Sequence, residues 1–526
     1  MIRKLKLSIT PAEASDDVAI VALAREELNL KNDDNLKLEL IKKSIDSRQK
    51  KILVNLSFHA FINEQRPEKV FPFKYFNVVK APVVYIAGSG PAGLFAALRC
   101  LELKLKPIIF ERGKELSRRR RDIAILNRNH TVNPDSNYCF GEGGAGTFSD
   151  GKLFTRTKNK NEVENILQIL VAHGANPSIL TDAHPHVGTN LLPRIIEAIK
   201  NTILSYGGEI HFDSKLVDIC VENQQVYAIK IKNLHKNKVE EYPCKKLILA
   251  TGHSARDIFF LLDKRKILIE SKSFAMGIRI EHPQELIDRI QYHCASPEEV
   301  LNVRKFLPPS EYSMVHTEDG KSVYSFCMCP GGIIAPCATA PEEIVTNGWS
   351  PSKRNNPFAN SGIVVNMEPE DWRHFLSYSS ALGALNLQVD LEKKAWAAGG
   401  GGQTAPAQRM MDFLKGKSSG SLPACSYTPG IRSYDLPELL GEKMTQLLRM
   451  GLKNFGISKP GYITNEAVLV GVESRTSSPI RIPRDKSNGQ HIHIKGLFPC
   501  GEGAGYAGGI VSAAIDGQKS ASFALR

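Results

Sequence analysis

The sequence predicts an α/β protein of about three domains whose centre is a parallel β-sheet. At 526 residues the chain is too long for a single hydrophobic core. Residues 83–87 form a short, continuously apolar run, typical of a strand buried on both faces of a parallel sheet. A helix over 91–103 and a second apolar strand at 107–110 complete a βαβ unit. From residue 461 the chain returns to this strand–loop–helix pattern, which indicates one domain assembled from two distant segments.

The composition is that of an ordinary globular protein, with 42% apolar and 23% charged residues. No apolar run approaches the roughly 18 residues of a membrane span. The first ten residues interrupt their apolar positions with lysines, which favours a β-strand over a secretory signal. The ten cysteines are scattered, which favours reduced thiols and a cytoplasmic location over a disulfide framework.

The net charge of +13 leaves two interpretations open. A basic surface attracts phosphates, acidic substrates or nucleic acid, whereas the simpler interpretation is solubility without a polyanionic partner. The densest basic run is Arg118–Arg121. Such a run is typical of a solvated helix face, of an electrostatic wall beside a bound diphosphate, or of an RNA contact.

Changes in the pattern of apolar residues, glycines and prolines along the chain predict four segments. Residues 1–78 form a small α+β appendage, with strands at 4–9 and 50–62 and helices at 16–30 and 35–45. The rest is divided into a first part of a dinucleotide-binding domain at 79–265, an inserted α+β substrate domain at 266–455, and the second part of the dinucleotide-binding domain at 456–526.

A glycine motif lies between the strand and the helix of the βαβ unit: Gly88-Ser89-Gly90-Pro91-Ala92-Gly93. Gly88 allows a tight turn, Gly90 lets the backbone approach a diphosphate, and Gly93 lets the helix pack closely on the sheet. Pro91 suits the first helical turn, where no amide donor is required. The free N–H groups and positive end of the helix dipole stabilise phosphate charge. Together with Glu111 at the end of the next strand, an acceptor for ribose hydroxyls, the motif predicts a Rossmann-like dinucleotide site.

Two further segments favour FAD over NAD as the dinucleotide. Residues 246–252 are an apolar strand that ends in Ala-Thr-Gly, where small side chains let the backbone pass beside a cofactor. Residues 497–510 are a strand, an acidic residue between glycines, and the start of a helix of small residues. Glu502 in that turn can accept a hydrogen bond from a ribityl hydroxyl, and the helix start can stabilise negative charge on a reduced flavin.

These motifs resemble those of flavoproteins with the two-dinucleotide-binding-domain type of FAD fold. More narrowly, residues 140–153, 326–332 and 399–409 resemble signatures of the poorly characterised FAD-dependent dehydrogenase family, also described as NAD(P)/FAD-dependent oxidoreductases. The resemblance covers roughly residues 80–526, and the N-terminal appendage in outline. It implies noncovalent FAD and oxidoreductase activity, and it supplies no substrate.

Position by position, the resemblance assigns contacts with FAD to three groups of residues. For the group in the glycine loop at 141–151, the alternative interpretation is a purely structural Ω-loop. The ADP half of FAD is assigned Gly88, Gly90, Pro91, Ala92, Gly93, Glu111, Arg112 and, through backbone bonds to adenine, Val217. The diphosphate or ring is assigned Gly143, Gly144, Ala145, Ala250, Thr251 and Gly252. The ribityl and ring end is assigned Gly501, Glu502, Gly509 and Ile510.

Cysteines and histidines supply the candidates for chemistry. Cys327 and Cys329 would point to the same face of a strand, which makes thiol exchange with a flavin conceivable, although cysteines are more often simply buried. With Cys337 they match no common zinc spacing, so no metal is expected. Among acid–base candidates, His253 beside the Ala-Thr-Gly turn is preferred. The weaker candidates are His184 and His186, and, as anchors for an anionic substrate, Arg279 and Arg409.

The sequence therefore predicts an FAD-dependent oxidoreductase that transfers a hydride between NAD(P)H and an unidentified small organic molecule. No separate built-in NAD domain is expected, so NAD(P)H would bind transiently at the flavin face. The alternative is a nucleic-acid-associated flavoprotein that modifies RNA, using residues 1–78 and the basic surface. The oligomeric state is not predicted.

Overall fold

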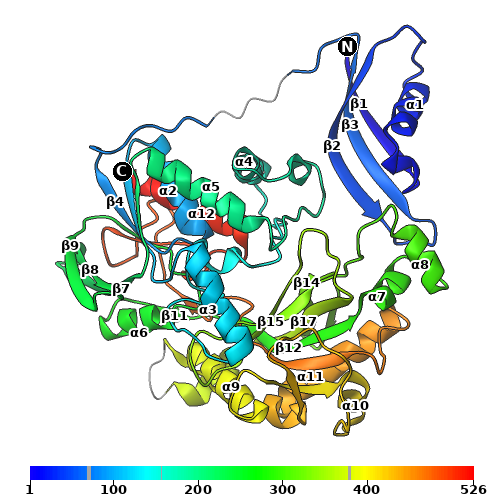
Figure 1. The fold of residues 1–526 in the computed structure, drawn as a ribbon. Coiled ribbons are helices and arrows are strands. Elements are labelled where there is room, and N and C mark those ends of the chain that lie inside the picture. Colours follow the sequence, from blue (N-terminus) through cyan, green and yellow to red (C-terminus); the bar gives the residue numbers. More distant parts are fainter. Residues whose placement is uncertain (68–72, 156, 377–380, 526) are drawn as a thin grey trace.

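The computed structural model describes residues 1–67, 73–155, 157–376 and 381–525 (Figure 1). Its centre is a five-stranded sheet in the order β22-β10-β4-β5-β6, in which every neighbouring pair is parallel. The fold confirms the predicted Rossmann-like α/β class with an inserted domain and a small N-terminal unit. The strands are β4 (Val83–Ala87), β5 (Lys106–Phe110), β6 (Glu209–His211), β10 (Leu247–Leu249) and β22 (Leu497–Pro499).

Both faces of this sheet are covered, which explains why its strands are continuously apolar. Alternate residues point to opposite faces: Val84 and Ile86 join a core with helices, whereas Ala87 and Leu249 join a second core. The helices of the first core lie together in Figure 1, namely α2 (Pro91–Glu102), α4 (Lys160–Ala172), α5 (Leu192–Ser205) and α12 (Ile510–Leu525). The second core contains α6 (Arg256–Lys264) and the antiparallel sheet of β7 (Ser214–Glu222), β8 (Gln225–Asn233) and β9 (Lys238–Pro243).

Helices α2 and α12 pack unusually closely, although they lie at opposite ends of the domain in sequence. A Cβ atom built on Gly517 of α12 would lie 2.0 Å from the carbonyl oxygen of Ala92 in α2. Only glycine permits this approach. It places the middle of α12 against the first turn of α2, where the glycine motif lies.

The chain between the two segments builds a seven-stranded sheet in the order β13-β14-β17-β12-β20-β18-β19. Its core side is covered by three helices, α9 (Gly383–Gly399), α10 (Met410–Lys415) and α11 (Leu436–Ser458). The expected domain boundary at residue 455 falls before β20, which nevertheless pairs with β12 and β18 in this sheet. The division into domains stays a prediction. The strands are β12 (Phe274–Pro283), β13 (Val315–Glu318), β14 (Lys321–Cys329), β17 (Phe358–Met367), β18 (Ala405–Arg409), β19 (Ile431–Ser433) and β20 (Val468–Glu473).

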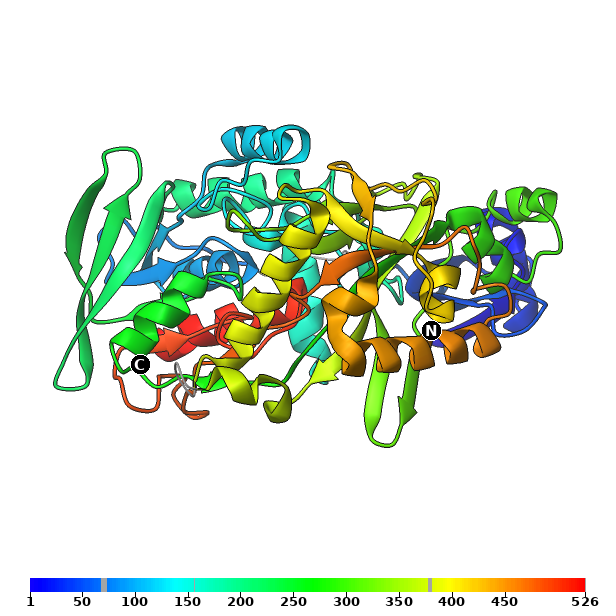
Figure 2. The same cartoon turned by 90° about the horizontal axis from the view of Figure 1, so that it is seen from below.

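The N-terminal unit is an antiparallel sheet in the order β1-β3-β2 that carries one helix, and Figure 2 shows it at one end of the molecule, with β7–β9 at the other. The helix expected at 35–45 is wrong, because this segment is strand β2. Its leucines at 36, 38 and 40 recur every second residue and pack on the core of the unit, which is the period of a strand. Tyr292 and Leu307, from the segments around α7 and α8, complete that core. The bounds are β1 (Ile2–Ile9), α1 (Asp17–Glu27), β2 (Leu36–Asp46), β3 (Leu53–Ile62), α7 (Gln284–Gln291) and α8 (Pro297–Val303).

The remaining elements are short, apart from one surface helix. They are α3 (Leu116–Asn129), β11 (Glu270–Ser271), β15 (Ile333–Pro336), β16 (Thr346–Trp349), β21 (Ile480–Arg481) and the 3-10 turns at Glu13–Ser15, Gly144–Gly146, Pro177–Leu180 and Pro369–Phe375. Within the described ranges, none of the helices combines the length and the apolar character that crossing a membrane requires.

Replacing Gly517 by Ala should lower the free energy of unfolding by about 1–3 kcal/mol, because the added methyl group meets a backbone carbonyl that cannot move independently. Helix propensity alone would favour alanine by about 1 kcal/mol, so the sign of the change tests the close contact. Gly420→Ala is the control, because Gly420 is exposed and its added Cβ meets no atom within 4 Å. Urea unfolding of both variants provides the measurement, and a neutral or stabilising Gly517→Ala would contradict the packing described.

Candidate functional site

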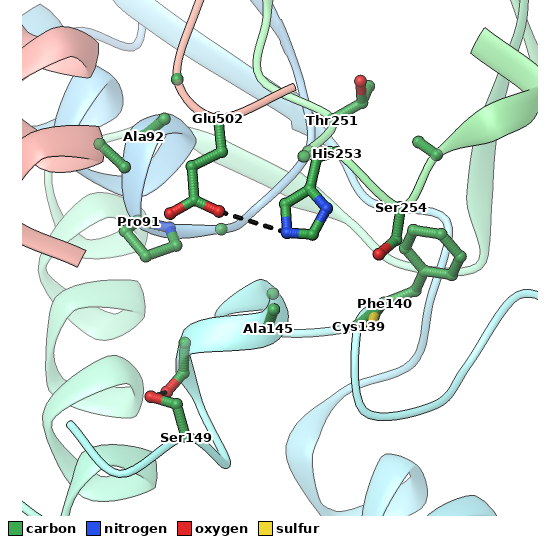
Figure 3. Close-up of a pocket in the computed structure, with 18 of the residues that line it drawn as sticks. Pro91, Ala92, Cys139, Phe140, Ala145, Ser149, Thr251, His253, Ser254 and Glu502 are labelled. Atoms are coloured by element: carbon green, nitrogen blue, oxygen red, sulfur yellow. Dashed lines mark hydrogen bonds and ion pairs between the residues drawn. The ribbon is translucent and has the colours of Figure 1, made fainter. Parts of the chain in front are cut away.

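A cavity of about 430 Å³ opens at the carboxyl edge of the five-stranded sheet (Figure 3). Its walls come from the segments that follow β4, β5, β10 and β22, joined by the glycine loop near residue 145 and by residues of the inserted part of the chain. Ligands of open α/β sheets bind at this edge, because the loops after parallel strands all emerge there.

Most of the predicted cofactor residues line this cavity, and their contacts with FAD stay predictions. Gly93 does not line it; a Cβ there would lie 1.9 Å from the Gly88 oxygen, so Gly93 serves the packing of α2 on β4. Gly143 is a turn residue with φ of +78°. Val217 is the extra residue of a β-bulge between residues that pair with Ile231 and Lys230. The residues that line the cavity are Gly88, Gly90, Pro91, Ala92, Glu111, Arg112, Gly144, Ala145, Ala250, Thr251, Gly252, Gly501, Glu502, Gly509 and Ile510.

Glycines make room for a dinucleotide along this wall. Gly90, the N-cap of α2, lies so close to Gly144 that a Cβ on Gly144 would stand 2.8 Å from the Gly90 Cα atom. Farther along, a Cβ on Gly252 or Gly509 would meet no protein atom within 4 Å, so these backbones face open space. The N-termini of α2 and α12 both reach the cavity through Pro91 and Ile510. Bare main chain and two positive helix ends fit the diphosphate and ring of FAD.

Glu111 holds together, through hydrogen bonds, the turns that surround the glycine-rich wall of the cavity. One carboxylate oxygen accepts hydrogen bonds from the amide and hydroxyl groups of Ser89, at 2.8 and 2.9 Å. The other accepts from the amides of Gly113 and Gly141, at 2.9 and 3.0 Å. Glu111 lines the cavity, and its predicted contact with ribose stays a prediction beside this structural role.

Arg119 is the residue that sequence reasoning missed. The Arg118–Arg121 run is not a uniform solvated face or wall, because Arg119 is fully buried. Its guanidinium donates at 2.7–2.8 Å to four carbonyl oxygens, two in the glycine loop and two in the turn before it, and at 3.3 Å to one hydroxyl. Burial lowers the pKa of Arg119 to about 10. The acceptors are the carbonyls of Asn137, Tyr138, Glu142 and Gly144 and the hydroxyl of Thr147.

His253 and Glu502 lie next to each other on the cavity wall, with Nε2 and Oε2 3.5 Å apart (Figure 3). Burial, together with the positive charges of Arg475 and Arg256, lowers the pKa of His253 to about 4. Burial also raises the pKa of Glu502. Nδ1 of His253 is buried and has no hydrogen-bond partner among the described residues. A neutral imidazole with one unsatisfied nitrogen therefore stands beside the closing turn of the C-terminal segment.

The two candidate cysteines do not share one face of a strand as expected. Strand β14 has an irregular register between Phe326 and Cys329, and Cys327 adopts a left-handed backbone with φ of +46°. Cys327 therefore lines the cavity, whereas Cys329 is fully buried behind it. Cys337 also lines the cavity, directly after β15.

The weaker candidates lie outside the cavity wall. Arg279 is fully buried and pairs with Glu473 at 2.8 Å, and Arg409 donates to main-chain oxygens of a surface loop. His184 stacks on Phe154 with ring centroids 5.4 Å apart. His186 pairs with Asp150, which does line the cavity. Further lining residues that the sequence did not single out are Asp150, Lys152, Trp349 and Arg475. Among the described residues no cluster of ligands suited to a metal ion is present.

The fold and this cavity define a Rossmann-like flavoprotein. A family model described as "FAD-dependent protein, C-terminal domain-like" matches residues 273–476, and a model of a domain of unknown function matches residues 1–61. An uncharacterized protein of Clostridium beijerinckii is 36% identical over 518 residues, which cover 94% of this chain and 93% of the relative. The chain belongs to the same family as this relative, and FAD is its cofactor.

Solved flavoprotein structures align over most of the chain at low similarity. The crystal structure of CtdE in complex with FAD has a TM-score of 0.33 and 11% identity, over 85% of this chain and 84% of that one. A geranylgeranyl bacteriochlorophyll reductase-like protein from Thermoplasma acidophilum has a TM-score of 0.34 and 13% identity, over 85% and 78% of the two chains.

Replacing Arg119 by Met should cost at least about 3 kcal/mol of unfolding free energy, because several buried carbonyl groups lose their donor. The protein should also be purified with little FAD, since the glycine loop loses its anchor. Arg120→Met is the matched control, because Arg120 is the exposed neighbour in the same helix. Thermal unfolding and flavin absorbance measure the two effects. Equal behaviour of the two variants would contradict the role given to Arg119.

The low pKa of His253 predicts a specific pH dependence of stability. The folded state binds the proton below about pH 4 and the unfolded state below about 6.5, so the unfolded state binds more protons in this window and stability rises with pH there. In flavin-free protein, His253→Gln should remove up to about 3 kcal/mol of this rise. Urea unfolding across the window provides the measurement, and an unchanged slope would show that His253 titrates normally.

Proposed function

We propose that this flavoprotein is an oxidoreductase, which passes a hydride between NAD(P)H and a small organic substrate through noncovalently bound FAD. The observation that carries the proposal is that the cavity wall has two chemically different parts. One part consists of glycine backbone and the start of α2. The other consists of side chains that can take part in chemistry, including His253, Glu502 and Cys327. When bound, the flavin supplies the hydride chemistry itself.

In this proposal the start of α12 and His253 position and polarise the bound molecules, and neither brings a formal charge into the cavity. The start of α12 presents main-chain N–H groups where a reduced flavin would gain negative charge. His253 stays neutral over the physiological range, because burial and two arginines oppose its protonation. Its Nδ1 can accept or donate a hydrogen bond to a substrate without introducing a buried charge.

A transient nicotinamide cofactor is the proposed reductant. The GxGxxG motif that follows β4 lines the cavity, and the two other matches to this pattern, at 141–146 and 503–508, lie in segments that reach the same cavity. NAD(P)H would therefore enter the open side of the same cavity, deliver its hydride and leave before the substrate binds.

The alternative of RNA modification loses part of its basis, because Arg119 is buried and Arg118 pairs with Asp213 at 3.0 Å. Two of the four arginines in the densest basic run are thus already engaged. The oxidoreductase proposal explains the cavity without a polyanionic partner.

An anaerobic titration of the purified holoprotein with NADH and NADPH tests the proposal. At least one of them should bleach the flavin absorbance, and flavin that stays oxidised with both would contradict NAD(P)H as the reductant. The Gly90→Asp variant should lose FAD and NAD(P)H oxidation, because a carboxylate would lie at the diphosphate cradle. Gly420→Asp is the control, because Gly420 is exposed outside the cavity and a Cβ there meets no atom within 4 Å.

A further inference from the structure

The segment of β14 that carries Cys327 departs from regular strand geometry. A left-handed backbone at a residue with a side chain costs about 1–3 kcal/mol and persists where the surroundings impose it. At Cys327 φ is +46°, and the register with β17 breaks between Phe326 and Cys329. Cys329 resumes the register opposite Asn360. The break turns the Cys327 side of the chain toward the cavity and leaves Cys329 buried behind it.

The two thiols are within hydrogen-bonding reach of each other. Cys329 Sγ also lies 3.3 Å from the carbonyl oxygen of Cys327. The irregular backbone therefore brings two cysteines together that a flat strand would hold apart. Among the described residues the chain has no metal cluster that would claim this pair.

Two cations surround the thiol pair. The Lys152 ammonium donates to the Met328 carbonyl and lies 3.9 Å from Cys329 Sγ. On the other side, the Arg279 guanidinium donates to the Cys327 carbonyl at 2.8 Å and lies 3.5 Å from Cys329 Sγ.

Each cation is held by a buried carboxylate: Asp150 lies 3.0 Å from Lys152, and Glu473 lies 2.8 Å from Arg279. His186 in turn contacts Asp150 at 2.9 Å. The hydrogen bond from Cys329, followed by the charges of Lys152 and Arg279, lowers the pKa of Cys327 against the opposing effects of burial and of Asp150. Burial raises the pKa of Cys329.

We propose that Cys327 and Cys329 are a redox-active thiol pair and that the substrate of the cavity is a small disulfide. Cys327 is the attacking thiolate, and Cys329 is the resolving thiol. This inference rests on the proposed function only for the return of electrons, which NAD(P)H supplies through the flavin.

The exchange balances in atoms and electrons. The Cys327 thiolate attacks one sulfur of the substrate, forms a mixed disulfide and releases the first substrate thiolate. Cys329 gives its proton to that thiolate, and its sulfur then attacks Cys327 Sγ, which releases the second thiolate and forms the internal disulfide. The protein has then lost two electrons and one proton. A hydride equivalent, two electrons and one proton, restores one thiolate and one thiol.

The test uses the holoprotein with its thiols reduced and its flavin oxidised, and 2-hydroxyethyl disulfide as substrate, with intact-mass and peptide mass spectrometry as the readout. Wild-type protein should form a Cys327–Cys329 disulfide. Cys329→Ser should stop at a mixed disulfide on Cys327, and Cys327→Ser should form neither product. Cys294→Ser is the control, because Cys294 is half-buried outside the cavity, and it should behave as wild type.

A second measurement remains valid if a cysteine variant fails to fold. At about pH 6, iodoacetamide should modify Cys327 before the other cysteines of the wild-type protein. Lys152→Met should slow this reaction at least about tenfold, because an adjacent positive charge is worth about one pKa unit or more. Preferential reaction of another cysteine, or an unchanged rate in Lys152→Met, would overturn the proposal.

The outcomes separate this inference from the proposed function. If NAD(P)H bleaches the flavin but wild-type protein forms neither a mixed nor an internal disulfide, the thiol pair is overturned and the oxidoreductase proposal stands. If the disulfide forms on Cys327 but NAD(P)H leaves the flavin oxidised, the thiol pair stands and the proposed reductant is overturned.

Discussion

The site depends on one strand of three residues. β10 hydrogen-bonds to β4 on one side and to β22 on the other, both in parallel. Because parallel neighbours end at the same edge, the turn after each strand opens into one cavity. The contact between Gly517 and Ala92 then fixes the middle of α12 against the first turn of α2. Without this pairing, the C-terminal glycine turn would have no place in the flavin site.

Buried charges hold the two large parts of the molecule together around the cavity. Arg256 at the start of α6 pairs with Glu343 and Glu392, and Arg475 at the end of β20 pairs with the same two carboxylates. A buried ion pair resists separation, because either partner left alone would be an uncompensated charge. Arg475 lines the cavity, so this network joins the two parts at the site itself.

The chemistry of the cavity follows from which groups are neutral and which are charged. Burial keeps His253 neutral, whereas the carboxylates of Asp150 and Glu473 anchor the two cations beside the cysteines. A bound flavin would thus have the uncharged imidazole of His253 at one wall of the cavity. At another wall it would have cysteine sulfur polarised by the two neighbouring cations. These properties do not arise from single residues, because each depends on partners from another part of the chain.

The sequence by itself determined the cofactor class and the central α/β fold. Gly88, Gly90 and Glu502 could be predicted to lie at the site, because strand ends and local glycine turns are encoded by neighbouring residues, and all three line the cavity. The helix expected at 35–45 is wrong, because the leucines at 36, 38 and 40 recur with the period of two that a strand has. Only the tertiary structure revealed that Arg119, alone among four consecutive arginines, turns inward to bind the glycine loop. It alone also placed Lys152 beside Cys329, since contacts between residues 177 positions apart depend on how the sheets pack and leave no local trace in the chain.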